Sequence, residues 1–189
     1  MKFFSLLLLF MLPLSLAAED SEWFAGIEGG MSEARFTKDS ANSGRVYGPQ
    51  YGLKIGLQKE YTRIYLGYNQ TKNMGTDLER SETLYLALEG VSDGVKVAAK
   101  SSAKLFVGVH LGAASAVING SASTEYMAYA EDPATTAYIA GFQTGFIFSL
   151  PADFEIELAY RHYLTYIKER PDFNSGTLYG GLNYRFYAF

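Results

Sequence analysis

The segment YGLKIGLQKEYTRIYLGYN, residues 51–69, decides the fold of this chain. In each half of it, apolar residues take every second position, and glycine, charged or amide residues take most of the positions between them. A period of two is the period of a β-strand. The charged residues Lys59 and Glu60 separate the halves, so the segment predicts a hairpin of two antiparallel strands.

The same alternation recurs on both sides of this hairpin and predicts an all-β chain of about eight antiparallel strands. We expect these strands at residues 23–34, 47–58, 63–69, 83–89, 104–117, 136–150, 154–163 and 176–189. Residues 95–99 are either an added short strand, which raises the count toward ten, or part of a connection, and we favour the connection.

The expected connections alternate in length along the chain. Those at residues 35–46, 71–80, 119–135 and 165–175 are long, whereas those after residues 58 and 150 are short turns. Transmembrane β-barrels show this asymmetry, with short turns on the periplasmic side and longer external loops. Because loops on a rigid barrel commonly carry recognition, these four long connections are candidates for external contacts.

The beginning of the chain has the order of a secretory signal peptide. Lys2 precedes an apolar segment, and the small residues Ser15, Ala17 and Ala18 follow, so we expect cleavage after Ala17 or Ala18. Pro13 interrupts the apolar segment, and a spanning helix needs about 20 apolar residues, which disfavours a retained membrane helix. The prediction is a signal at residues 1–18 and one barrel domain at residues 19–189.

The remaining composition restricts the class of protein further. No later stretch is apolar enough to cross a bilayer as a helix, so membrane insertion has to use a closed sheet. Without the signal, the chain has 15 basic residues against 20 acidic ones, which argues against binding to nucleic acid. It has no cysteine, so disulfides do not stabilise it.

The two faces of the expected strands differ in a way that assigns them to lipid and to the barrel interior. One face carries almost no charge, and a Lys or Arg there costs about 2–4 kcal/mol at the bilayer midplane. The other face combines charges with many glycines, as a narrow interior requires. A water-soluble, lipocalin-like barrel is the alternative, but it places Lys and Glu along its exposed face.

The last strand ends in an aromatic residue after an alternating apolar face that includes Leu178. Here the sequence resembles the small outer-membrane β-barrel family that includes OmpA-like and OmpX-like proteins. The resemblance implies a bacterial outer-membrane location, contact with outer-membrane lipids and lipopolysaccharide, and a monomer. It also implies an insertion signal that the barrel-assembly machinery reads, at Leu182, Tyr184, Phe186 and Phe189. Three residues follow Phe186, so the insertion signal ends either at Phe186, which shares the apolar face of the strand, or at the terminal Phe189.

Eight charged residues fall on the expected interior face, four of each sign. They are Glu28, Lys54, Arg63, Glu89, Glu155, Glu157, Arg161 and Arg185. Charges in a narrow interior need partners, so we expect a network of ion pairs and hydrogen bonds, with Tyr65, Tyr85 and Gln143, that plugs the barrel. In the alternative, the same charges line a narrow solute pore.

An enzyme is the third interpretation, because some small outer-membrane barrels are lipid A deacylases with a lipid-facing His and a nearby Ser. His162 shares its strand face with the apolar Leu164, whereas Thr165 points away, so the hydroxyl that nucleophilic catalysis requires is missing. We expect His162 in an aromatic girdle, His110 packed inside the barrel, and no catalytic residue, metal or cofactor. The predicted function is a structural or surface-interaction role in the cell envelope.

Overall fold

The computed structural model describes residues 21–37, 43–74, 78–118, 135–166 and 173–186. Over these ranges the chain forms nine β-strands and one short 3-10 turn. The strands are β1 (Glu22–Thr37), β2 (Ser43–Lys59), β3 (Thr62–Met74), β4 (Leu78–Val91), β5 (Val95–Ala98), β6 (Ser101–Ile118), β7 (Thr135–Ser149), β8 (Phe154–Tyr166) and β9 (Phe173–Phe186). The predicted signal peptide and Phe189 lie outside the described residues.

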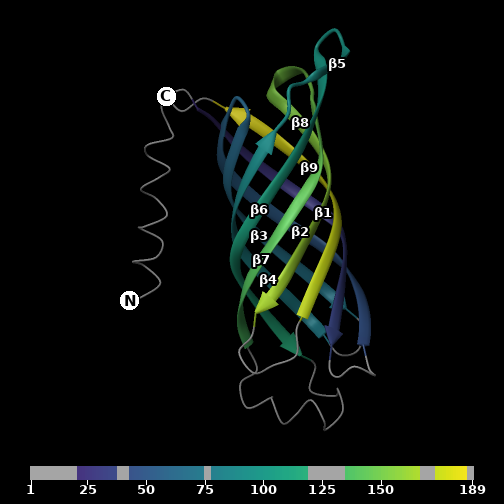
Figure 1. The fold of residues 1–189 in the computed structure, drawn as a ribbon. Helices are drawn as coiled ribbons and strands as arrows, with labels where there is room; N and C mark the ends of the chain where they lie inside the picture. Colours follow the sequence, from purple (N-terminus) through teal and green to yellow (C-terminus); the bar gives the residue numbers. More distant parts are fainter. Residues whose placement is uncertain (1–20, 38–42, 75–77, 119–134, 167–172, 187–189) are drawn as a thin grey trace.

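Eight of these strands close into an antiparallel barrel (Figure 1). The order of hydrogen-bonded neighbours is β4-β3-β2-β1-β9-β8-β7-β6, and pairing of β4 with β6 completes the circle. Closure gives each barrel strand two partners, so the backbone hydrogen bonds are made within the sheet. The predicted all-β, up-and-down barrel is confirmed. Within the described ranges, no helix is long and apolar enough to cross a membrane.

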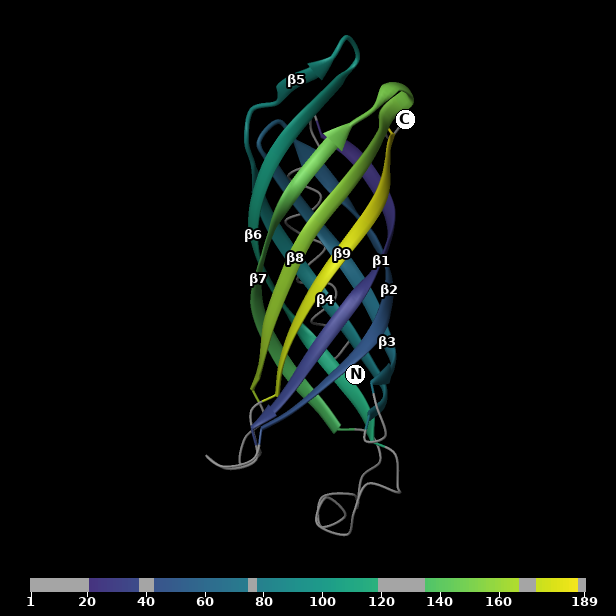
Figure 2. The same ribbon diagram turned by 90° about the vertical axis from the view of Figure 1, so that its right-hand side faces the viewer.

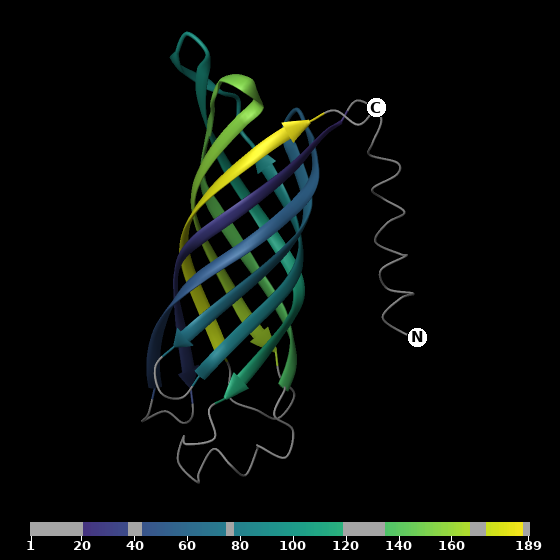
Figure 3. The same ribbon diagram turned by 180° about the vertical axis from the view of Figure 1, so that it is seen from behind.

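The two ends of the barrel differ. At one end, Glu60 and Tyr61 join β2 to β3, a turn at Pro151–Asp153 joins β7 to β8, and the start of β1 pairs with the end of β9. We call this the turn end; it lies at the top of Figure 3. At the opposite loop end, the strand pairs β1–β2, β3–β4, β6–β7 and β8–β9 approach the residues that the structure does not describe.

Alternate side chains along each strand point outward and inward. Leu53 on β2 is 60% exposed and its neighbour Lys54 is 3% exposed, while on β8 Leu158 is 54% exposed and Glu157 is completely buried. The apolar face therefore forms the outer wall, and the charged, glycine-rich face points into the barrel, as predicted. The strands are tilted strongly against the barrel axis (Figure 2), which is how a closed sheet of few strands leaves just enough room for side chains.

Glycines provide that room where a large side chain crosses the interior. A Cβ atom at Gly67 would lie 2.3 Å from the Tyr85 ring, and one at Gly141 would lie 2.6 Å from Nε2 of His110. Neither ring could keep its position beside a larger residue.

At the loop end, the predicted strand ends were wrong for three of the four long connections. Residues 71–80, expected to form a long polar connection, belong largely to β3 and β4, whose ladder continues through Thr71–Ser81 and Lys72–Arg80. Likewise, β1 and β2 extend into 35–46, and β8 and β9 extend into 165–175. At these positions the change from apolar to polar residues marks the edge of the apolar belt, and the strands continue beyond it. The boundaries at 118 and 135 agree with the expected long connection.

The preference for a plain connection at residues 95–99 was also wrong. Residues 95–98 form β5, which pairs with Ser101–Ala103 of β6 in a hairpin beyond the barrel wall. Because β5 adds to the end of β6 and not to the closed circle, the barrel count remains eight.

Candidate functional site: the charged interior of the barrel

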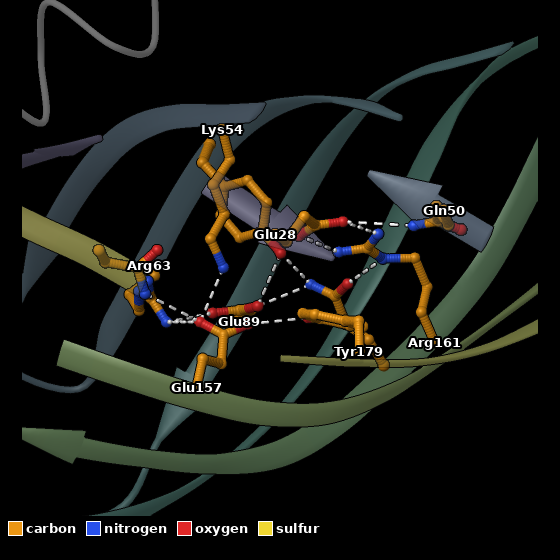
Figure 4. A network of polar contacts seen from close by, with 11 residues as sticks. Glu28, Gln50, Lys54, Arg63, Glu89, Glu157, Arg161 and Tyr179 are labelled. Atoms are coloured by element: carbon orange, nitrogen blue, oxygen red, sulfur yellow. Dashed lines mark hydrogen bonds and ion pairs between the residues drawn. The ribbon is translucent and has the colours of Figure 1, made fainter. Parts of the chain in front are cut away.

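A carboxylate on β8 is the centre of the interior network. Glu157 lies against Lys54 of β2 and Arg63 of β3, with Nζ at 2.7 Å and a guanidinium nitrogen at 3.1 Å from Oε2 (Figure 4). The Tyr179 hydroxyl donates to Oε1 at 2.8 Å, and the Asn183 amide donates to Oε2 at 3.1 Å. These charged side chains are completely buried. Four donors thus replace the hydration that this carboxylate loses.

A second carboxylate, on β4, shares one of these cations. Arg63 lies 3.2 Å from Oε2 of Glu89, and Oε1 accepts hydrogen bonds from the Tyr65 hydroxyl at 2.9 Å and from Nε2 of Gln143 at 2.6 Å. Gln143 also accepts a hydrogen bond from Nε of Arg161 at 2.9 Å. The glutamine therefore connects this half of the network to the other half.

The other half is a bidentate ion pair between Arg161 of β8 and Glu28 of β1. Two guanidinium nitrogens of Arg161 donate to the two oxygens of Glu28, at 2.6 and 3.1 Å. The guanidinium also lies against the rings of Tyr85 and Tyr179, with its carbon 4.7 and 4.4 Å from the ring centres. Tyr85, predicted as part of the network, thus contributes its aromatic face to the cation.

Six of the eight predicted residues therefore form one cluster, and the other two lie nearer the turn end. Arg185 approaches Glu155 at 3.5 Å, and it also pairs with Glu22 at 2.8 Å and Asp153 at 3.7 Å. Arg185 remains partly exposed, whereas the Glu155 side chain is completely buried. The eight predicted residues carry equal numbers of each charge, and each has at least one opposite partner.

A layer of neutral polar groups covers the cluster toward the loop end. Gln50 donates to Glu28 at 3.4 Å and accepts from the Thr177 hydroxyl at 2.9 Å. Thr177 lies 3.1 Å from the Ser32 hydroxyl, which in turn contacts Ser175 at 2.9 Å. The interior therefore passes from ion pairs to hydroxyl groups along the barrel axis.

The two histidines lie on opposite faces of the wall. His110 is 1% exposed, and its ring centre is 5.4 Å from that of Tyr85, so it is packed inside as expected. His162 faces outward beside Phe142 and stacks on Tyr160, with ring centres 5.6 and 6.3 Å apart. The Tyr160 hydroxyl is 3.5 Å from Nδ1, a phenol neighbour that the sequence interpretation overlooked.

Two other predictions, on metal binding and on the insertion signal, can be compared with the described residues. No group of three or more His, Asp or Glu in the described ranges is placed to hold a metal ion. Leu182, Tyr184 and Phe186 of the predicted insertion signal point outward and are 43%, 47% and 36% exposed.

The sequence interpretation missed several network members, although the signal for two of them was present. Tyr179 and Asn183 alternate with the outward residues Leu178 and Leu182, so their phase in the last strand already placed them inside. Glu22 and Asp153 sit at strand ends, where alternation carries no information, and the sequence offered no signal for their contact with Arg185.

Comparison with known proteins gives the fold a precedent. No protein-family model and no curated protein matches this sequence. The crystal structure of Neisserial surface protein A superposes with a TM-score of 0.61 at 16% identity, over 89% of this chain and 100% of the other.

Two further solved structures align at lower scores. Ail, the attachment invasion locus protein of Yersinia pestis, has a TM-score of 0.43 at 16% identity, over 87% of this chain and 99% of the other. The N-terminal β-barrel domain of Pseudomonas aeruginosa OprF has a TM-score of 0.45 at 14% identity, over 84% and 97%. From the closed sheet and the superposition with the Neisserial protein, this chain has the fold of the small eight-strand outer-membrane β-barrels, the architecture of OmpA-like and OmpX-like proteins.

Proposed function

We propose that this protein spans the bacterial outer membrane as a plugged barrel and serves a structural or surface-interaction role in the envelope. The supporting observation is the ion pair between Arg63 and Glu157, at 3.1 Å. These residues belong to β3 and β8, which lie diametrically opposite in the order of eight strands. This contact between opposite walls and the buried side chains bonded beside it, including Glu89, Tyr65 and Gln143, fill the interior and support a closed barrel at that level.

The outer wall supports the membrane part of the proposal. Large apolar side chains such as Leu53, Val109 and Leu158 are more than half exposed around the barrel. A continuous apolar surface of this kind is stable in hydrocarbon and unfavourable in water. Outer-membrane lipids and lipopolysaccharide are therefore the proposed surroundings, and the turn end faces the periplasm. Adhesion or ligand contacts are assigned to the loop end.

Planar-bilayer recording separates the plugged barrel from a narrow pore. We expect purified wild-type protein, inserted into a bilayer, to give no stepwise conductance. The double variant Arg63→Ala/Glu157→Ala removes the contact between opposite walls, and we expect small, reproducible channels from it. Reproducible channels from the wild type would overturn the plugged interpretation.

Insertion through the terminal strand is a separate part of the proposal. We propose that the barrel-assembly machinery reads the outward residues Leu182, Tyr184 and Phe186. Replacing all three by serine is expected to move the chain from the outer-membrane fraction to the periplasm. Serine at Thr177, an inward position of the same strand, is the matched control and should leave outer-membrane assembly unchanged.

A further inference from the structure

The β5 hairpin presents a strand edge that the rest of the protein does not cover. β5 pairs with Ser101–Ala103 of β6 on one side and ends the order of hydrogen-bonded neighbours on the other. All four of its residues are exposed. Within the described part of the chain it is the one strand with a single partner strand. An edge of this kind offers backbone N–H and C=O groups to another extended chain.

The hairpin also carries exposed apolar side chains beyond the turns that close this end of the barrel (Figures 1 and 2). Val95 is 72% exposed and Val97 is 65% exposed. The hairpin extends past the turns between β2 and β3 and between β7 and β8, away from the barrel wall (Figures 1 and 2). Exposed apolar residues beyond the lipid-facing belt favour a partner that covers them.

The charge of the hairpin indicates the chemistry of that partner. Residues 94–104 contain Lys96, Lys100 and Lys104 and no acidic residue. Lys96 and Lys100 are exposed, and neither has an ion pair with any described residue. A second copy of this chain is a poor partner, because pairing two β5 edges brings lysines of the same charge together. Acidic side chains complement the hairpin.

We propose that β5 is a docking strand for an extended, acidic segment of another protein on the turn-end side of the membrane. The segment adds to the free edge through backbone hydrogen bonds, its apolar side chains cover Val95 and Val97, and its carboxylates pair with Lys96 and Lys100. This role is independent of the plugged interior, since no residue of the hairpin tip belongs to the charged network. The surface is small, so the complex is weak and sensitive to salt.

Titration with a model strand tests the proposal on the full chain, refolded in zwitterionic nanodiscs. The probe is a capped eight-residue peptide of alternating glutamate and valine, with fluorescence anisotropy for affinity and amide NMR shifts for location. We expect shifts at residues 95–98 and an affinity about tenfold lower for Lys96→Glu/Lys100→Glu. The variant Val95→Thr/Val97→Thr tests the apolar contribution at unchanged charge, and its affinity should also fall. Lys72→Glu, a charge reversal at the loop end, is the control and should bind as the wild type does.

Several results would overturn the proposal. One is equal affinity for a peptide in which lysine replaces glutamate, and another is full affinity in Lys96→Glu/Lys100→Glu. Shifts confined to residues outside the hairpin have the same meaning. Lysine-dependent binding to anionic vesicles, without a response to the peptide, would assign the hairpin to lipid headgroups instead. Self-association through β5 would identify a second copy as the partner.

Discussion

Replacing Glu157 by glutamine tests whether buried charge pairing stabilises this barrel. The carboxylate and Lys54 are both completely buried, and their closest atoms are 2.7 Å apart. Glu157→Gln keeps the size of the side chain but removes its charge, which leaves Lys54 as an uncompensated buried cation. Removing one partner of a buried ion pair costs about 3–5 kcal/mol. We expect the free energy of unfolding to fall by that amount.

Restoring neutrality should recover most of the loss. In the double variant Lys54→Met/Glu157→Gln the unpaired charge is gone, and neutral residues of similar volume in place of a buried ion pair are often tolerated well. Urea unfolding of the refolded protein, followed by the fluorescence of the single Trp23, measures both variants. Glu60→Gln, in the exposed turn, is the control and should leave unfolding unchanged.

Two results would refute this reasoning. The first is a loss below about 1 kcal/mol in Glu157→Gln, the range of exposed ion pairs. The second is a double variant as unstable as the single one, which would mean that the hydrogen bonds to the carboxylate, and not the unpaired cation, determine the cost.

Three further predictions concern the wall, the interior glycines and the turn end. Leu158→Lys, on the lipid-facing wall, should destabilise the barrel in vesicles by about 2–4 kcal/mol, whereas Leu158→Phe should unfold at nearly the wild-type urea concentration. Gly67→Val should cost about 1–3 kcal/mol in the same assay, because its Cβ meets the Tyr85 ring. The pKa of the Tyr61 phenol lies above its usual value of 10 because Asp93 accepts its hydrogen bond and repels the phenolate. Asp93→Asn should therefore lower that pKa, and an unchanged tyrosine NMR titration would contradict the contact.

The architecture and the contents of the interior were accessible to sequence reasoning because both follow from a period of two. Once Leu53 and Ile55 are outside, Lys54 has to be inside, and the same phase places Glu157 and Arg161 there. Burial then requires that the charges balance. The equal numbers of acidic and basic residues on one face therefore indicate pairing.

The sequence could not predict which charged residues pair across the barrel, because the pairing depends on the tilt and stagger of the strands. Arg63 and Glu157 are 94 residues apart in the chain, and local alternation contains nothing that aligns β3 with β8 across the barrel. The predicted strand ends were wrong for a related reason, because the pairing of Lys72 with Arg80 continues the ladder beyond the last residues of the apolar alternation. The strand at β5 was one of two interpretations and was not the favoured one, because four alternating residues are too few to distinguish a short strand from a connection.

Spin-label accessibility at one outward position tests the central assignment of the two faces most directly. The chain has no cysteine, so Leu158→Cys can be labelled alone in the vesicle-inserted protein, with Glu60→Cys at the turn end as the water-exposed reference. If the apolar wall contacts hydrocarbon, the label at position 158 collides often with dissolved oxygen and rarely with a water-soluble nickel chelate. Access of the chelate equal to that at position 60 would place this wall in water and contradict the account.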